Sequence, residues 1–250
     1  QVEVFRGPQG TRFGASAMAG LINIKTKAPT DSFEGKVKAM LGNYNSQALG
    51  AVISGPASDI ANYRLSAEKY TSDGFIKNTH LDREDTNNRD ELKVHGKLHL
   101  VLSDELTAEL GLVHIDMNNG YDAFSLDNTR ETLSDKPGFD TQETNLVSTK
   151  LTYTGWEHAD VIAIGSFAKS DIGYGYDEDW AFEGIHDWEY ASTDHYLRER
   201  DSVTTELRLI SNESSKLFDE STSWVVGIYN RSEKETLDRE YTYLDENYTS

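Results

Sequence analysis

Cysteine is absent from this chain of 250 residues, and long apolar runs and basic residues are scarce. Without cysteine there is no disulfide framework, no thiol nucleophile and no cysteine-based zinc site. No apolar run of about 18 residues or more occurs, which excludes a transmembrane helix. Lysine and arginine total 24 against 43 aspartates and glutamates, so the formal net charge is -19. Nucleic acids select basic surfaces, and we therefore expect no nucleic-acid partner.

What the chain does contain is a strict alternation of apolar and polar residues. Low hydrophobicity with high net charge can indicate disorder, but period-two alternation is typical of β-strands. The stretch "ELKVHGKLHLVL" places its leucines and Val94 on one face and Lys93, His95, Lys97 and His99 on the other. The stretch "VTTELRLI" places Glu206 and Arg208 opposite Val203, Leu207 and Leu209.

The alternating segments predict about nine strands. They lie near residues 36–45, 47–56, 61–73, 90–103, 106–118, 143–155, 160–173, 198–211 and 222–235. Short turns are predicted at 55–59, 103–105, 155–158 and 212–215, and long polar loops at 74–89, 119–142, 174–197 and from 236 onward. Short turns at one end and long loops at the other are typical of an antiparallel up-and-down transmembrane β-barrel, and strands of this length can cross a bilayer.

In a wide barrel the polar faces line the interior and the apolar faces contact lipid. We therefore expect His95, Lys97, His99, Glu206 and Arg208 to face the lumen. Aromatic residues near the strand ends fit a membrane interface, although tyrosine and tryptophan favour strands in any case. A soluble all-β domain stays the alternative.

The glycine-rich stretch "RGPQGTRFG" near the start of the chain could be a phosphate-binding loop. That interpretation fails because no Gly-Lys-Ser or Gly-Lys-Thr follows it and Gly-x-Gly-x-x-Gly is absent. Glycine and proline at this density instead predict a tight turn, formed by Gly7, Pro8, Gly10 and Gly14.

The longer stretch "VEVFRGPQGTRFGASAMAGLINIKTKAPT", from Val2 to Thr30, resembles the last part of the plug domain of TonB-dependent outer-membrane receptors. The family pattern is roughly Val/Ile-Glu-Val-x-Arg-Gly-Pro, then Tyr/Phe-Gly, small residues, and Gly-x-Ile-Asn-Ile. Phe13 stands where tyrosine is commoner, and Ala19 where a second glycine is frequent. The later stretches "GNYNSQALGAVISGP", "YRLSAEKYTSDGFIKN" and "LHLVLSDELTAELGL" are similar to the start of the family's barrel.

The resemblance implies a barrel of about 22 strands closed by a plug. This chain would be a fragment, with the end of the plug in residues 1–32 and the first part of the barrel in residues 33–250. In the family the arginine of the Arg-Gly-Pro motif pairs with glutamates of the barrel wall. We carry that role over to Arg6, with Glu3 as a second plug charge in the latch, and expect the wall glutamates beyond Ser250. An ordinary solvated arginine is the alternative.

The loop "GYGYDEDWAFEGIHDWEYASTDHYLRER" concentrates aromatic and acidic residues. Its rings could form a stacking platform for a sugar or an aromatic chelator. The candidates for ligand binding are Trp180, Trp188, Tyr176, Tyr190, His186 and His195, with Tyr174 also in the platform. His186, Asp187, Asp194 and His195 could ligate a metal, and residues 82–91 could bind calcium, although no dedicated metal motif occurs. A solvated loop above an aromatic girdle is the alternative. Adjacent Glu178 and Asp179 make a poor glycosidase pair.

The resemblance implies TonB-dependent uptake of a scarce nutrient across the bacterial outer membrane, without enzymatic chemistry or a cofactor. The implied partners are outer-membrane lipid, the TonB energy-coupling complex and the nutrient, which could be an iron–siderophore, another metal chelate, cobalamin or a saccharide. The acidic loops favour neutral or cationic ligands over anionic siderophores. A passive porin and a soluble β-rich carbohydrate-binding protein stay open as alternatives.

Overall fold

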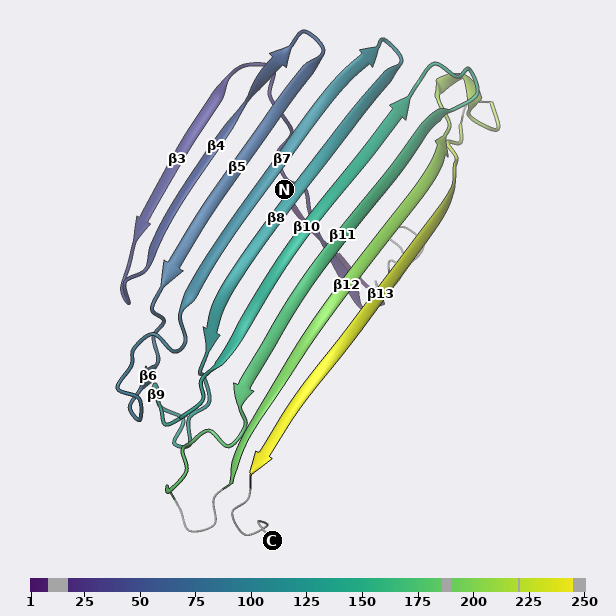
Figure 1. Ribbon diagram of the computed structural model, residues 1–250. Helices are drawn as coiled ribbons and strands as arrows, with labels where there is room; N and C mark the ends of the chain where they lie inside the picture. Colours follow the sequence, from purple (N-terminus) through teal and green to yellow (C-terminus); the bar gives the residue numbers. More distant parts are fainter. Residues whose placement is uncertain (9–17, 186–189, 220, 245–250) are drawn as a thin grey trace.

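The computed structural model describes residues 1–8, 18–185, 190–219 and 221–244. They form one large antiparallel sheet and two small strand pairs (Figure 1). The nine strands of the large sheet are β3 (Glu34–Leu41), β4 (Gln47–Ser58), β5 (Ala61–Ser72), β7 (Arg89–Ser103), β8 (Leu106–Tyr121), β10 (Gly138–Tyr153), β11 (Asp160–Asp177), β12 (Ala191–Ile210) and β13 (Val225–Leu244). Each pairs with the next in chain order, so the predicted all-β, up-and-down architecture is confirmed. Within the described residues, no helix is long and apolar enough to cross a membrane.

The ends of the later strands differ from the prediction. Strand β10 begins at Gly138, β11 continues to Asp177, β12 begins at Ala191, and β13 runs from Val225 to Leu244. Near the long loops both faces of these strands are mostly polar or aromatic, with few aliphatic residues such as Leu197 and Leu237. The hydropathy alternation therefore fades there, while the backbone pairing continues.

Two of the predicted turns also lie elsewhere. Strand β4 continues through Gly55 and Pro56 to Ser58, with an irregularity in register between Pro56 and Ser58, so the turn follows at residues 59–60. A register break of this kind tolerates proline, which cannot donate to the ladder. The connection at 211–224 contains a short 3-10 turn, η1 (Glu213–Ser215), and is longer than predicted.

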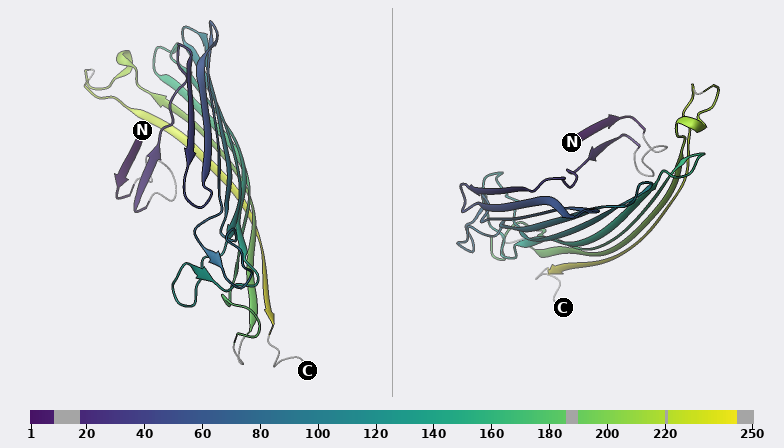
Figure 2. Two further views of the ribbon diagram at one scale, coloured as in Figure 1. Left: turned by 90° about the vertical axis from the view of Figure 1, so that its left-hand side faces the viewer. Right: turned by 90° about the horizontal axis from the view of Figure 1, so that it is seen from above.

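The large sheet is curved, and the two other strands near the start of the chain lie on its concave side (Figure 2). Strands β1 (Val2–Arg6) and β2 (Gly20–Ile24) form an antiparallel hairpin. The segment after it is tied to the sheet, because Lys97 Nζ donates to the Thr26 carbonyl at 3.2 Å and Asn62 Nδ2 donates to Asp31 at 2.7 Å.

Cross-strand pairing places the predicted interior residues on this same concave side. His99 pairs across the sheet with Glu109, which pairs with Lys150, and the row continues through Ile164 to Glu206. His95, Lys97 and Arg208 share that face by the alternation of their strands.

The convex face changes character along the strands. Toward the short turns it is apolar, with a cross-strand row formed by Leu112, Val147, Phe167 and Val203. Leu112 is 57% exposed and Phe167 48% exposed. Four residues closer to the loops, a second row consists of Asp116, Glu143, Asp171 and Glu199.

Little apolar surface is buried between elements. Among the described residues, the buried apolar side chains are Ala48, Ile76, Ala108, Ala159, Ala181 and Ala191. The backbone ladder therefore defines the architecture, and the large apolar side chains point away from the sheet into its surroundings.

Candidate functional site

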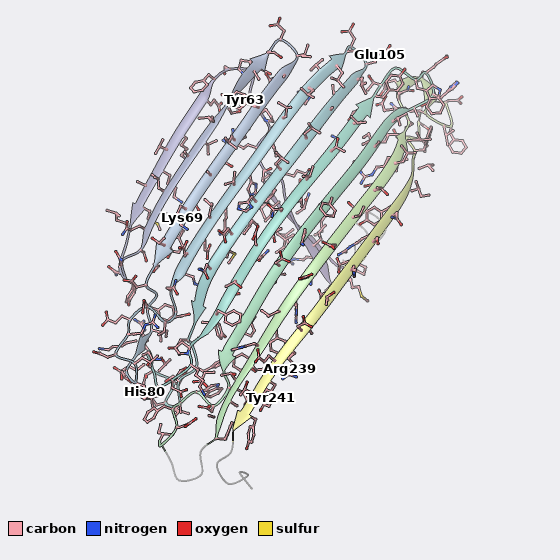
Figure 3. The ribbon with its side chains drawn as sticks, viewed as in Figure 1. Tyr63, Lys69, His80, Glu105, Arg239 and Tyr241 are labelled. Atoms are coloured by element: carbon pink, nitrogen blue, oxygen red, sulfur yellow. The ribbon has the colours of Figure 1, made fainter. Side chains whose placement is uncertain are left out.

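The long connections gather at one end of the sheet and contact one another. Figure 3 marks the two ends, with Glu105 at a short turn and His80 among the loops. Two short strands from different loops, β6 (Lys77–Asn78) and β9 (Glu131–Thr132), pair in parallel. A third loop joins them, because the rings of His80 and Phe182 stack with centroids 4.1 Å apart.

Asn78 is the centre of this loop cluster and is 0% exposed. Its Nδ2 donates to Asp122 at 2.9 Å and to the Ser134 carbonyl at 2.7 Å, while its Oδ1 accepts from the Leu81 amide at 2.8 Å. Thr132 donates to the same Asp122 oxygen at 2.8 Å. A buried amide with its donors and acceptor all bonded fixes the relative positions of two loops.

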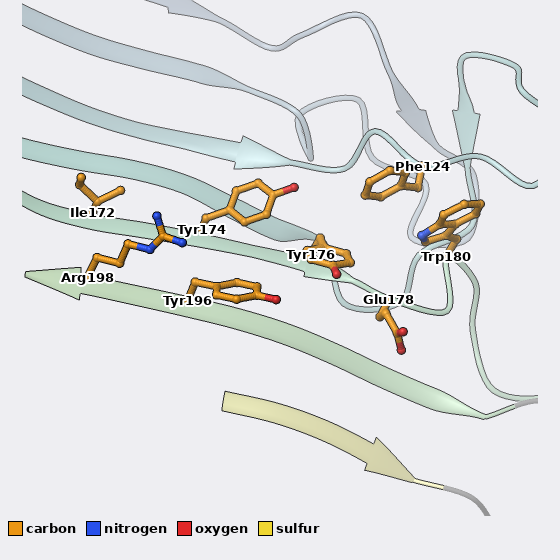
Figure 4. Close-up of a pocket in the computed structure, with 8 residues that line it drawn as sticks. All are labelled: Phe124, Ile172, Tyr174, Tyr176, Glu178, Trp180, Tyr196 and Arg198. Carbon is orange, nitrogen blue, oxygen red and sulfur yellow. The ribbon is translucent and has the colours of Figure 1, made fainter. Parts of the chain in front are cut away.

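Next to the loop cluster, the concave face of β11 and β12 forms a cavity of about 710 Å³ (Figure 4). It is lined by Phe124, Ile172, Tyr174, Tyr176, Glu178, Trp180, Tyr196 and Arg198. Alternate residues of a strand share a face, which is why Ile172, Tyr174 and Tyr176 of β11 all reach it. Phe124 and Trp180 come from two different loops.

The rings form a continuous aromatic wall. Phe124 and Trp180 are stacked with centroids 4.9 Å apart, and Phe124 meets Tyr176 edge-on at 5.7 Å. Tyr174 lies 6.4 Å from Tyr196 across the two strands. Such contacts at 4.5–7 Å hold rings in defined orientations and leave faces available for a planar ligand.

A single carboxylate orients part of this wall. Asp194 is 2% exposed and accepts hydrogen bonds from Tyr196 at 2.7 Å and Tyr176 at 3.3 Å. Arg239 of β13 donates to both of its oxygens, Nε at 2.8 Å and Nη2 at 2.7 Å. The guanidinium also lies over the rings of Tyr196 and Tyr241, 5.1 Å and 5.6 Å from their centroids. The positive charge of Arg239 therefore neutralises the Asp194 carboxylate inside the site.

A second acidic group lies among the loops, on the face of β11 opposite to the cavity. Asp177, the last residue of β11, is 5% exposed. Burial, reinforced by the neighbouring carboxylates of Asp179 and Asp135, raises the pKa of Asp177 to about 7, and the Ser134 hydroxyl offsets part of that rise. Burial likewise raises the pKa of Asp135. Asp179 accepts from the Ala181 amide at 3.0 Å and the Ser192 amide at 2.7 Å, which fastens the loop to β12.

The structure brings some of the proposed ligand residues together and separates others. Trp180 and Tyr176 line the cavity, as does Tyr174. Tyr190 stacks on Tyr243 at 5.3 Å instead. His195 lies on the convex face, 5.2 Å from the Phe139 ring. His186 and Trp188 lie outside the described residues.

The proposed metal ligands are not assembled. Asp194 and His195 are neighbours in a strand and face opposite sides of the sheet, and Asp187 lies outside the described residues. In the segment from Asp82 to Glu91, Asp85 is paired with Arg83 at 2.8 Å. The described part of the chain contains no group of three or more metal-ligating side chains arranged to hold an ion.

Five cavity residues were not among the ligand candidates from the sequence, namely Phe124, Ile172, Glu178, Tyr196 and Arg198. Phe124 follows β8 in a different loop, and Tyr196 and Arg198 lie in a segment assigned to loop or to the very start of a strand. The signal was available, since all long loops emerge at one end and alternate strand residues share a face. To use this signal, the predicted strand at 198–211 would have had to begin seven residues earlier, at Ala191.

The proposed plug residues lie in and beside the hairpin. Glu3 is held within it, accepting from Asn23 Nδ2 at 2.8 Å and Lys25 Nζ at 3.0 Å. Arg6 is exposed at the end of β1, and its latch role stays a prediction. Gly7 has a φ of 79°, a left-handed conformation that glycine adopts without strain, and Pro8 follows it. Gly10 and Gly14 lie outside the described residues.

Known proteins resemble this chain in sequence and in fold. No protein-family model matches it. The ferric enterobactin receptor PirA of Pseudomonas aeruginosa is 36% identical over 81 residues, covering 29% of this chain and 11% of that protein. A probable TonB-dependent siderophore receptor PirA of Acinetobacter baumannii is 29% identical over 134 residues, covering 48% of this chain and 17% of that protein. The chain thus spans less than a fifth of either relative.

The fold extends the likeness to nearly the whole chain. The crystal structure of the ferric yersiniabactin uptake receptor FyuA from Yersinia pestis matches with a TM-score of 0.80 at 19% identity, covering 96% of this chain and 37% of that one. The FpvAI–pyocin S2 complex matches with a TM-score of 0.70 at 16% identity, over 96% and 32% of the two chains. Sequence and fold therefore both resemble those of TonB-dependent receptors of the bacterial outer membrane, the family that the Arg-Gly-Pro segment predicted.

Proposed function

We propose that this chain is part of a receptor that takes up a ferric siderophore across the outer membrane, with energy supplied through TonB. The observation that carries the proposal is the aromatic cavity of about 710 Å³ on the concave face, at the loop end of the sheet. Its volume lies in the range of small-molecule sites, and its lining combines apolar rings with a few polar groups.

The names of the relatives favour chelated iron over the other ligands considered. The ferric enterobactin receptor and the ferric yersiniabactin uptake receptor are both described as receptors for iron complexes. A further similar structure is that of a Pseudomonas aeruginosa receptor bound to ferripyoverdine. Cobalamin and saccharides have no comparable support.

The two faces of the sheet suit the remaining parts of the proposal. The apolar row on the convex face would contact lipid, and the hairpin on the concave side would belong to the plug. A plug distinguishes an energised receptor from a passive porin. The proposal includes no covalent chemistry and no cofactor, because binding and release of an intact chelate need neither.

Uptake of radioactive iron by iron-starved cells tests the function. Cells that express the protein should accumulate ferric siderophore, and deletion of the gene or loss of TonB should abolish accumulation. Uptake that continued without TonB would instead support the porin alternative. The control is a siderophore that enters the same cells through another receptor, whose uptake should survive deletion of this gene.

A further inference from the structure

Most arginines on the concave face of the last strands have a carboxylate partner. Arg200 donates from Nε to Glu235 at 2.8 Å, and Arg239 binds Asp194. Arg208 pairs with Glu206 and Arg231 with Glu233. The wall is therefore built so that its cations are neutralised by side chains of the same or the adjoining strand.

Arg198 is different. It belongs to β12, two residues from Arg200 and on the same face, yet its guanidinium makes no ion pair or hydrogen bond with any residue of the described ranges. Its Nε is buried. A guanidinium carries five donors and a permanent charge, so leaving it unpaired at a partly desolvated position is costly. Arg198 is thus available for an anion from outside the wall.

Two tyrosine rings lie on the loop side of this cation. In Figure 4 the guanidinium lies beside the ring of Tyr174, with Tyr196 next along β12. The hydroxyls of Tyr196 and Tyr176 are already bonded to Asp194. The wall therefore offers ring faces rather than free hydrogen-bonding groups, which suits a flat aromatic ligand better than a saccharide or an aliphatic chelate.

The acids near the cavity are also engaged. Asp194 is neutralised by Arg239, and Glu178 accepts from the Ser192 hydroxyl and from Tyr241 at 3.1 Å. The acidity of the loops as a whole had favoured neutral or cationic ligands. Inside the cavity, the one charge with no partner among the described residues is positive, and it favours an anion.

We propose that this cavity selects ferric chelates whose iron-binding arms are planar aromatic oxyanions, catecholate or phenolate, and that Arg198 binds their negative charge while the ring wall stacks on them. This inference rests on the proposed function and specifies its substrate class. Arg198 supplies bidentate hydrogen bonds to the oxyanion, and Tyr174, Tyr176 and Tyr196 supply apolar contact.

Binding of radioactive iron complexes to outer membranes from cells expressing the protein tests the proposal. The probes are a ferric tricatecholate of dihydroxybenzoyl-serine and ferrioxamine, an aliphatic trihydroxamate. The tricatecholate should bind far more tightly. R198Q should weaken its binding by about 10- to 100-fold, the range expected for losing hydrogen bonds to a charged group.

Two variants separate this role from a structural one. R200Q removes an arginine of the same strand and face that is already paired with Glu235, and it should change binding by less than about threefold. R198K keeps the charge without the fork and should recover part of the loss. Heat-modifiable migration on gels checks that each variant is folded.

These experiments distinguish failure of the aromatic-oxyanion proposal from failure of the proposed receptor function. Tight ferrioxamine binding, or tricatecholate binding that R198Q leaves unchanged in a folded protein, would overturn the aromatic-oxyanion proposal while receptor function stood. Failure of the protein to bind or import any ferric siderophore would remove the proposed function, and this inference with it.

Discussion

The concave and convex faces of the large sheet are made by the same strands, yet they follow different rules. On the concave face charged side chains are frequent and mostly paired, as with Lys150 and Glu109 at 2.8 Å. On the convex face an apolar row gives way, four residues on, to the carboxylates of Asp116, Glu143, Asp171 and Glu199. Adjacent residues of one strand thus serve two surroundings, and only the apolar belt is suited to lipid.

The largest expected effect comes from a charge placed in the middle of the apolar part of the convex face. L207R should cost about 2–4 kcal/mol near the membrane midplane and remove most of the folded protein from the outer membrane. Leu207 lies four residues closer to the short turns than Val203, and its neighbours across the strands are Ala163 and Ile228.

The matched control places the same charge on the other face. S202R introduces an arginine opposite Glu233 on the concave side and should be tolerated. Heat-modifiable migration and the amount of protein in outer membranes measure both variants. Equal loss in the two would contradict the assignment of the faces.

The next effect concerns the loop cluster. N78L removes the hydrogen bonds of a fully buried amide and leaves Asp122 and the Ser134 carbonyl short of a donor, at a cost of about 2–4 kcal/mol to loop docking. The loops should become sensitive to protease while the strands stay protected. K77L changes the exposed neighbour in β6 and should leave the cleavage rate as it was; similar cleavage of both variants would argue against the network.

A smaller effect is expected at the arginine that neutralises the cavity's buried acid. R239Q leaves Asp194 charged and holding only its tyrosine hydrogen bonds, so the aromatic wall loses its outer support. Siderophore binding should weaken by about 3- to 10-fold. R231Q, on the same face of β13 and paired with Glu233, is the control, and it should bind as the unchanged protein does.

The smallest effect is a pH dependence of loop docking. The pKa of Asp177 is raised to about 7 in the folded protein. Between the ordinary pKa of an aspartate and pH 7, the docked state therefore binds this proton more tightly than the undocked state does. Docking is then most stable at acidic pH and weakens as pH rises toward 7. Protease cleavage of the loops should be several-fold faster at pH 8 than at pH 5, and D177N should flatten the profile. A profile that D177N leaves unchanged would assign the effect to another group.

Much of the sheet could be predicted because period-two alternation survives wherever one face is apolar. Lys97 and Glu206 were assigned to the interior on that basis, and they lie on the concave face. The loop ends of β10 to β13 were missed because both faces are mostly polar or aromatic there.

The site was predicted only in part, for a related reason. Tyr176 and Trp180 stand out in a visibly aromatic stretch, whereas Phe124 and Arg198 acquire their place in the cavity from residues of other strands and loops. The pairing state of an arginine depends on which carboxylates the register brings alongside. The sequence alone gives no reason to distinguish Arg198 from Arg200. They differ because the register places Arg200 opposite Glu235.

The meander topology carries a consequence for assembly. Every strand of the large sheet pairs with the strand before it, so most of the ladder closes across a short or moderate length of chain. Contacts that are local in sequence carry a low loop-closure entropy. The wall can therefore be built hairpin by hairpin in the order of synthesis, each finished edge serving as the template for the next strand.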